Sequence, residues 1–195
     1  IHFSYSANVG NAIYIDNFRI VYLDEIKKPV VVEAESGVVG SDFSILEEDS
    51  ITYVTIQTNL AAYNPGSSAR VISYEVTFPD TGSYDLFVRL RTGSGTYDDD
   101  SFFYGKGFGE KDPSVDSVWV CINGLAAAGF SGPNEIVHDA GGLGSGVWKW
   151  VNLSRNVYQG SVESLVTFII DDPDSLTQTF QIGAREDGLD IDKIA

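Results

Sequence analysis

The sequence predicts an all-β fold, an antiparallel β-sandwich of the jelly-roll type with long loops at one rim. Short runs rich in Val, Ile, Tyr, Phe and Thr alternate with clusters of Gly, Pro, Asn, Asp and Ser, which is typical of sandwiches and barrels. No long stretch shows helical periodicity. The 195 residues are 43% hydrophobic and 12% aromatic, which is enough to bury one large core.

Eleven segments have strand character, and two of them alternate clearly between apolar and polar residues. The predicted strands are 12–23, 30–35, 51–57, 69–78, 83–91, 101–104, 117–123, 147–153, 163–170, 177–184 and 190–195. The alternation predicts two core faces, made by Ile72, Tyr74, Val76 and Phe78 and by Tyr84, Leu86, Val88 and Leu90. The segments 92–116 and 124–146 are predicted to be long loops, and such loops usually carry function.

A domain boundary is predicted near residues 24–29, which are charged and end in Pro29. We interpret 1–27 as the terminal strands of a preceding β-domain plus a linker, and 28–195 as the sandwich. The segment 13–20 and the closing segment 189–194 share an Ile-Asp pair, which suggests two closing strands. We therefore expect the chain to be a piece of a longer protein.

The charge pattern excludes several classes of partner. The formal net charge of −16 repels nucleic acid and anionic membranes, and no apolar run approaches the length of a membrane span. The single cysteine, Cys121, lies in the apolar run 118–122, which favours a small buried hydrophobe over a reactive thiol.

Three ordered motifs carry a family resemblance. They are Val31-Val32-Glu33-Ala34-Glu35-Ser36-Gly37, Pro79-Asp80-Thr81-Gly82-Ser83-Tyr84-Asp85-Leu86, and Arg185-Glu186-Asp187-Gly188-Leu189-Asp190-Ile191-Asp192-Lys193-Ile194. Over residues 30–195 the chain resembles carbohydrate-binding modules of families 6 and 35. The segment from Phe102 to Phe130 departs from that pattern and looks like an insertion.

The resemblance implies non-catalytic binding of a plant cell-wall glycan, such as xylan or another β-linked polymer. It further implies a secreted or cell-surface bacterial protein in which the module targets a covalently linked glycoside hydrolase to its substrate. The expected partner is a polysaccharide or oligosaccharide, with no nucleic acid and no membrane.

The resemblance also implies a structural Ca²⁺ bound by Glu33, Glu35 and Asp192. Glu33 and Glu35 are two residues apart on a predicted strand, so their carboxylates face the same side and repel one another unless a cation lies between them. Oxygen ligands of this kind suit Ca²⁺. A pair of solvated carboxylates on an edge strand is the alternative.

Sugar-binding candidates are aromatic and polar residues in or beside the loops, because sugars stack on rings and hydrogen-bond through hydroxyl edges. The resemblance implies that Trp148 forms one wall of a site at the loop rim, and that Tyr63 and Asn64 belong to a second wall. Further candidates are Tyr104, Phe108, Asn134 and Asp190. A structural role at the sandwich edge stays open for each of them. Trp150 is predicted to be a core residue.

The sequence offers no catalytic motif. The two histidines, His2 and His138, lack a neighbouring nucleophile motif, and a glycosidase would need two opposed carboxylates. Two alternatives to a binding module remain: a small β-sandwich hydrolase or lyase, and an adhesion or spacer domain without a glycan site.

Overall fold

The computed structural model describes residues 29–129, 136–137, 144–154 and 166–195. The regular elements in these ranges are β-strands and short 3-10 turns, with no α-helix among them, so the predicted all-β fold is confirmed. None of the described elements is a helix capable of spanning a membrane. The predicted strand 12–23 and the predicted domain of 1–27 lie outside the described residues.

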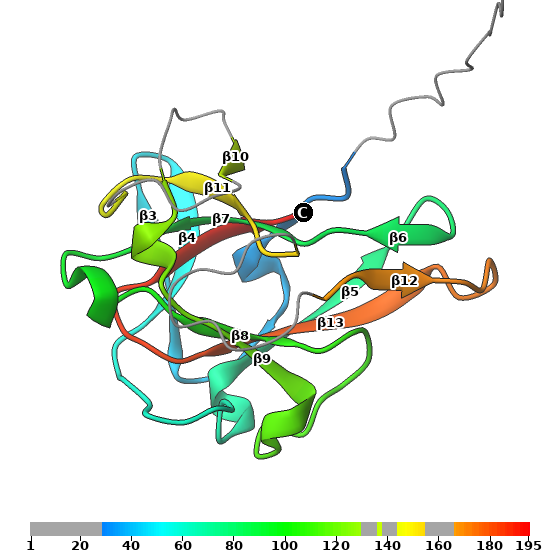
Figure 1. Ribbon diagram of the computed structural model, residues 1–195, viewed down its shortest axis with the longest axis horizontal. Helices are drawn as coiled ribbons and strands as arrows, with labels where there is room; N and C mark the ends of the chain where they lie inside the picture. Colours follow the sequence, from blue (N-terminus) through cyan, green and yellow to red (C-terminus); the bar gives the residue numbers. More distant parts are fainter. Residues whose placement is uncertain (1–28, 130–135, 138–143, 155–165) are drawn as a thin grey trace, which may run out of the picture.

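One sheet, called sheet A below, forms the face on which the candidate site lies (Figure 1). Its spatial order is β10 (Ile136–Val137), β11 (Lys149–Asn152), β7 (Phe87–Arg91), β14 (Asp190–Ile194), β4 (Ile51–Ile56) and β3 (Phe43–Glu48). The short strand β1 (Val32–Glu33) also pairs with β14. The pairing is antiparallel except between β10 and β11, which run parallel.

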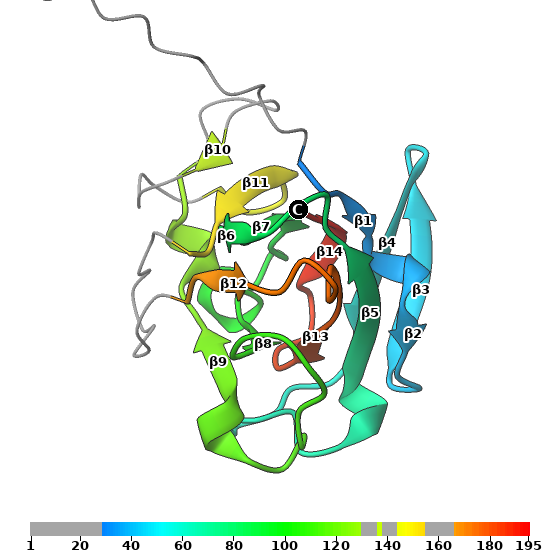
Figure 2. The same cartoon turned by 90° about the vertical axis from the view of Figure 1, so that its right-hand side faces the viewer.

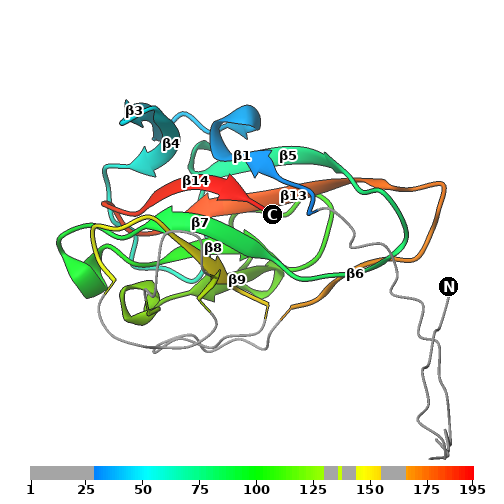
Figure 3. The same ribbon diagram turned by 90° about the horizontal axis from the view of Figure 1, so that it is seen from above.

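The second sheet, sheet B, packs against sheet A. Its order is β2 (Val38–Val39), β5 (Val71–Thr77), β13 (Thr177–Ala184), β8 (Phe102–Gly105) and β9 (Trp119–Ile122). A separate pair, β6 (Gly82–Tyr84) with β12 (Phe168–Ile170), extends one end of the sandwich. Figure 2 shows β1 to β4 along one side of the molecule, and Figure 3 shows the C-terminus beside β1.

The first strands link the two sheets. Between β1 in sheet A and β2 in sheet B, the chain forms a 3-10 turn, η1 (Ala34–Ser36). Ala34 is completely buried, and its carbonyl accepts a 2.7 Å hydrogen bond from the Tyr74 hydroxyl on β5. This contact ties the crossover to the centre of sheet B.

The core between the sheets contains both faces that alternation predicts. Ile72, Tyr74, Val76 and Phe78 are all buried. On the other sheet Leu86, Val88 and Leu90 are buried, whereas Tyr84 is only partly buried and packs against the core. The prediction of one continuous strand over 83–91 is wrong in detail, because the structure divides it into β6 and β7.

Within the segment 102–129, Phe102–Gly105 forms β8 and Trp119–Ile122 forms β9 of sheet B, as the predicted strands 101–104 and 117–123 require. Tyr104 is 1% exposed in the main core. On the opposite face of sheet B, a second cluster consists of Val71, Phe103, Trp119 and Cys121. The expectation that Cys121 is a small buried hydrophobe is confirmed.

A buried lysine and a buried aspartate hold the turn that follows β9. Lys149 Nζ donates to the carbonyls of Leu125 (2.8 Å) and Ala128 (2.7 Å). Asp100 accepts from the N–H groups of Gly124 (3.3 Å) and Ala126 (2.9 Å). Both side chains belong to fully buried residues, so the backbone groups of this turn are satisfied inside the protein.

Burial opposes the charge on both of these groups. It lowers the pKa of Lys149 to about 8, against the attraction of Asp100. It raises the pKa of Asp100 to about 6, although the N–H groups of Ala126 and Gly124 favour the carboxylate.

The first testable consequence is a stability that rises with pH above about 8. Unfolded Lys149 keeps its ordinary pKa near 10.5, so between about pH 8 and 10.5 the unfolded chain binds a proton that the folded chain has released. Urea unfolding measured across this range checks the rise. Lys149→Met should flatten this rise of the unfolding free energy with pH. The matched control Lys106→Met, at an exposed position, should leave the rise unchanged. Equal slopes in the parent protein and Lys149→Met would contradict this account.

Candidate functional site

The outer face of sheet A carries the candidate site because β7 alternates. Val88 and Leu90 point into the core, so Arg89 and Arg91 point outward. On β11, Trp150 lies opposite Arg89 in the antiparallel register and therefore on the same outer face. Trp150 is partly exposed and lies outside both buried clusters, so the prediction that it belongs to the core is wrong.

Trp148 lies just before β11 and packs against both arginines. The Arg91 guanidinium carbon is 4.7 Å from the centroid of the Trp148 ring, and that of Arg89 is 5.3 Å away. Arg91 also lies 5.2 Å from the ring centroid of Tyr53 on β4. Tyr53 and Trp148 meet edge to face at 5.5 Å. The Arg91 side chain thus contacts two aromatic rings from separate strands, an arrangement that favours a cation.

Carboxylates fix the orientation of the two guanidinium groups. Arg91 donates from Nε (2.9 Å) and Nη2 (2.8 Å) to Oδ2 of Asp190, and its Nη1 pairs with Glu48. Arg89 pairs with Asp192. We call this group the Arg91 cluster; it consists of Glu48, Tyr53, Arg89, Arg91, Trp148, Asp190 and Asp192.

A tight turn places Glu48 in the cluster. Asp49 and Ser50 connect β3 to β4 with φ angles of +51° and +65°, as in a type I′ hairpin turn. The turn sets a register in which Glu48 pairs with Ile51 and Leu46 with Tyr53. Glu48 and Tyr53 therefore approach Arg91 from the same hairpin.

The ion pairs are partly shielded from water. The side chains of Arg91 and Asp190 are 20% and 15% exposed. Burial raises the pKa of Asp190 above its ordinary value, although hydrogen bonds from Arg91 and Thr55 favour the carboxylate. Burial disfavours the charge of Arg91, but the hydrogen bonds to Glu48 and Asp190 outweigh it, and the pKa of Arg91 is raised.

Chemically, the Arg91 cluster presents the two features that a sugar recognises. Trp148 is a partly exposed ring that can stack against the C–H face of a pyranose. Next to it, guanidinium donors alternate with carboxylate acceptors, and such groups hydrogen-bond to hydroxyls with defined geometry. Contacts within the protein hold each of these side chains in place.

The structure brings together only two of the predicted sugar-binding residues, Trp148 and Asp190. Tyr63 is 67% exposed on the loop after β4. Its neighbour Asn64 donates to the Ser114 carbonyl (3.3 Å) and to Asp116, and so joins two loops. Asn134 lies outside the described residues.

Two predicted sugar contacts are corrected by burial and position. Tyr104 is a core residue at 1% exposure, so its ring cannot stack on a glycan. Phe108 is partly buried and packs on Phe78 and Phe168 at ring-centroid distances of 5.3 and 5.1 Å. It therefore belongs to an apolar cleft elsewhere in the sandwich.

Sequence reasoning missed Tyr53, Glu48 and the two arginines. The outward position of Arg89 and Arg91 is visible in the alternation of β7, but their ring partners come from β4 and from the start of β11. Only the order of strands in the sheet places these side chains together, and that order is not readable from a single sequence.

Two of the three consecutive aspartates at 98–100 use their side chains within the protein. Asp100 binds the turn described above, and Asp99 accepts a 2.7 Å hydrogen bond from the Gly95 N–H. A Cβ atom on Gly188, where φ is +73°, would lie 2.6 Å from Asp99 Cγ. The close fit of Asp99 therefore requires glycine at position 188.

The three predicted calcium ligands have different surroundings. Glu33 pairs with Lys193 Nζ at 2.5 and 2.6 Å, and Asp192 pairs with Arg89. Glu35 Oε2 is buried without a hydrogen-bond partner. Across the described ranges, no three His, Cys, Asp or Glu side chains form a ready metal-binding group. Glu35 thus fits a cation ligand, whereas Glu33 and Asp192 would first have to leave their basic partners.

Comparisons with known proteins find distant structural likeness alone. No family model and no curated protein matches the chain. Among solved structures, an isomalto-dextranase of Arthrobacter globiformis, determined with panose, is similar with a TM-score of 0.45 and 15% sequence identity. The alignment covers 84% of this chain and 22% of that carbohydrate-active enzyme.

Proposed function

We propose that this chain binds a polysaccharide without cleaving it, through the Arg91 cluster on the outer face of sheet A. The observation that carries the proposal is the partly exposed Trp148 ring beside guanidinium–carboxylate pairs that are already in place. A stacking ring with an adjacent fixed hydrogen-bonding edge matches the two faces of a sugar. The predicted site therefore moves from the loop rim to the sheet face.

The charges of the cluster favour a neutral glycan. Each arginine is paired with at least one carboxylate, so neither offers an unbalanced positive charge to a uronate or sulfate group. The chain as a whole carries a net charge of −16, which repels polyanions. Xylan or another neutral β-linked plant polymer is the ligand class that we propose.

The same carboxylates argue for binding rather than hydrolysis. Asp190 and Glu48 both bind the Arg91 guanidinium, whereas a glycosidase needs two carboxyl groups on opposite sides of the scissile bond. Asp100, the carboxyl with a pKa of about 6, is fully buried against backbone N–H groups. We therefore propose a non-catalytic module that targets a linked catalytic domain in a secreted or cell-surface protein.

Affinity electrophoresis against neutral and uronate-containing plant and algal polysaccharides tests the proposal. At least one neutral β-linked polymer should retard the protein. Trp148→Ala should weaken that binding at least about tenfold, because losing a stacked ring costs on the order of 1–3 kcal/mol, by analogy with base stacking. The variant should stay folded, as judged by circular dichroism, because Trp148 is only partly buried.

The matched control is Tyr63→Ala, which removes a more exposed ring from a loop outside the cluster. This variant should keep the parent affinity. If Tyr63→Ala weakens binding while Trp148→Ala does not, the site belongs to the loop rim. Release of reducing ends by the parent protein would show that it cleaves the polysaccharide and would contradict the proposal of non-catalytic binding.

We propose in addition that Ca²⁺ stabilises the fold through Glu35. The unpaired Oε2 of Glu35 lies near Tyr74, whose pKa is raised by burial and by the charge of Glu35. A cation bound there would compensate a buried carboxylate, and a ligand that binds only the folded state stabilises it.

Exhaustive chelation with EDTA should therefore lower the melting temperature, and added Ca²⁺ should restore it. Glu35→Gln should melt at the same temperature with and without Ca²⁺. Glu47→Gln, a change at an exposed position of β3, should respond like the parent. If chelation leaves the melting temperature of the parent protein unchanged, the proposed structural Ca²⁺ is wrong.

A further inference from the structure

An apolar cleft lies at the opposite end of the sandwich from the Arg91 cluster. Strand β7 begins beside the cleft at Phe87 and ends in the cluster at Arg91, and β14 runs from Asp190 in the cluster to Ile194 at the cleft. The volume of the cleft is about 540 Å³, which is within the range of ligand-sized pockets. Neither the Arg91 cluster nor the proposed Ca²⁺ site at Glu35 uses this cleft.

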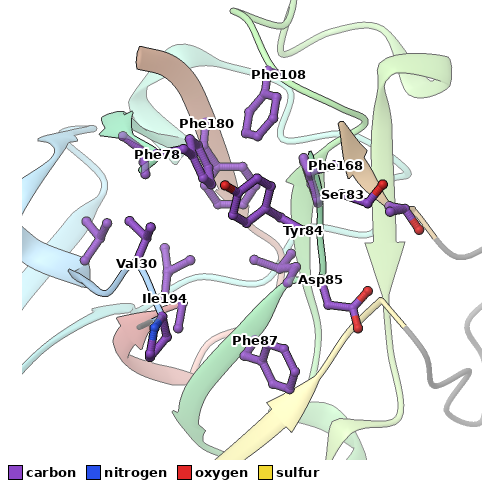
Figure 4. A pocket seen from close by; sticks show the side chains of 16 residues that line it. Val30, Phe78, Ser83, Tyr84, Asp85, Phe87, Phe108, Phe168, Phe180 and Ile194 are labelled. Carbon is purple, nitrogen blue, oxygen red and sulfur yellow. The ribbon is translucent and has the colours of Figure 1, made fainter. Parts of the chain in front are cut away.

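Six aromatic rings line this cleft (Figure 4). Phe78 meets Tyr84 at 4.6 Å and Phe108 at 5.3 Å between ring centroids. Phe168 meets Phe108 at 5.1 Å and Phe180 at 5.5 Å. Among the described residues, the polar side chains in the lining are Ser83, Asp85 and Thr167. Contiguous apolar surface of this kind usually marks an interaction site.

Both ends of the described chain line the cleft. Pro29 and Val30 lie on one side of it, and Ile194 and Ala195 belong to the same lining. Val32 pairs with Ile194, so the entering chain is fixed against the last strand. Any residue a few positions before Pro29 is therefore held close to the mouth of the cleft.

The sequence upstream of Pro29 supplies a matching apolar segment. Residues 12–23 are strand-like, and in an extended chain Phe18, Ile20 and Tyr22 share one face. The five residues 24–28 separate this segment from Pro29. A flexible linker of that length spans about 12 Å on average. The segment is therefore tethered to the cleft at a high effective concentration.

We propose that residues 12–23 dock in this cleft as an extended strand, with Phe18, Ile20 and Tyr22 against the aromatic wall. The charged linker 24–28 would then stay in water while the apolar face is buried. In a longer protein, this contact would hold the preceding β-domain against the sandwich, in an orientation set by the cleft.

The segment 155–165 also lies outside the described residues and ends two positions before Thr167 of the lining, but it fits less well. The Ser154 hydroxyl donates a 2.8 Å hydrogen bond to the Val166 carbonyl, so the two ends of this segment are pinned together. It also contains no phenylalanine or isoleucine. The segment 12–23 is richer in large apolar residues and enters directly beside the lining.

Photo-cross-linking in the full chain tests this docking. Phe108 is replaced by p-benzoylphenylalanine, a larger ring of similar shape, and cross-linked peptides are identified by mass spectrometry. The main product should be an intramolecular link to residues 12–23. Ile169 on β12 is 63% exposed, and the same label there should give no such link. A label at Tyr84, which also lines the cleft, repeats the test if the Phe108 variant fails to fold.

A second pair of variants separates docking from chance contact. The double change Phe18→Asp and Ile20→Asp should abolish the cross-link, and should lower the melting temperature by on the order of 5 °C, because buried apolar contacts are lost. Arg19→Ala, on the other face of the segment, should keep both. Links to 155–165, links between two copies, equal links from Ile169, or no link beyond the cleft lining would each overturn the proposal.

Discussion

The guanidinium of Arg91 ties together parts of the chain that are far apart in sequence. It contacts Tyr53 on β4 and Trp148 before β11, and it binds Asp190 on β14 and Glu48 at the end of β3. The two rings and the two carboxylates all stabilise the positive charge of this partly buried guanidinium. Arg91 is the side chain that joins the Trp148 ring to the other strands of the proposed site, and Arg89 and Tyr53 also pack against that ring.

The rest of the sandwich supports that arrangement from below. Immediately after Trp148, Lys149 turns inward and holds the carbonyls of Leu125 and Ala128, while Leu90 packs opposite it in the core. The strand that carries Trp148 is thus anchored on its inner side by a buried charge. On the outer face of the sheet, the contacts within the Arg91 cluster add rigidity, and they join residues that are far apart in the sequence.

Much of the fold could be predicted because strand periodicity is a local signal. The buried faces of β5 and β7 follow from alternation over a few residues. The two-residue strands β2 and β10 were missed because they are too short to show alternation. The edge strand β3 was missed because most of it is exposed. The sequence makes Tyr104 a candidate sugar contact because glycines follow it, but it lies within the predicted strand 101–104, and all four residues from Phe102 to Gly105 are buried in β8.

The site was harder to predict than the fold. Trp148 was expected from the resemblance and Asp190 as a further polar candidate, and both contact Arg91 on the outer face of sheet A. The arginine that joins them was visible as an outward charge on β7. Its role depends on β14 pairing with β7 on one side and with β4 on the other, an arrangement created by long-range pairing.

Nuclear magnetic resonance of the ¹⁵N-labelled protein tests the central claim most directly. The indole signals of Trp119, Trp148 and Trp150 and the Nε signals of Arg89 and Arg91 are followed while an oligosaccharide of the best-binding polymer is added. We expect the Trp148 and Arg91 signals to shift with saturation, while that of Trp119, which is 1% exposed and packs with Phe103 and Cys121 on sheet B, stays in place. Saturable shifts confined to the loops around Tyr63 and Tyr97, or no shift with any polymer of the panel, would contradict it.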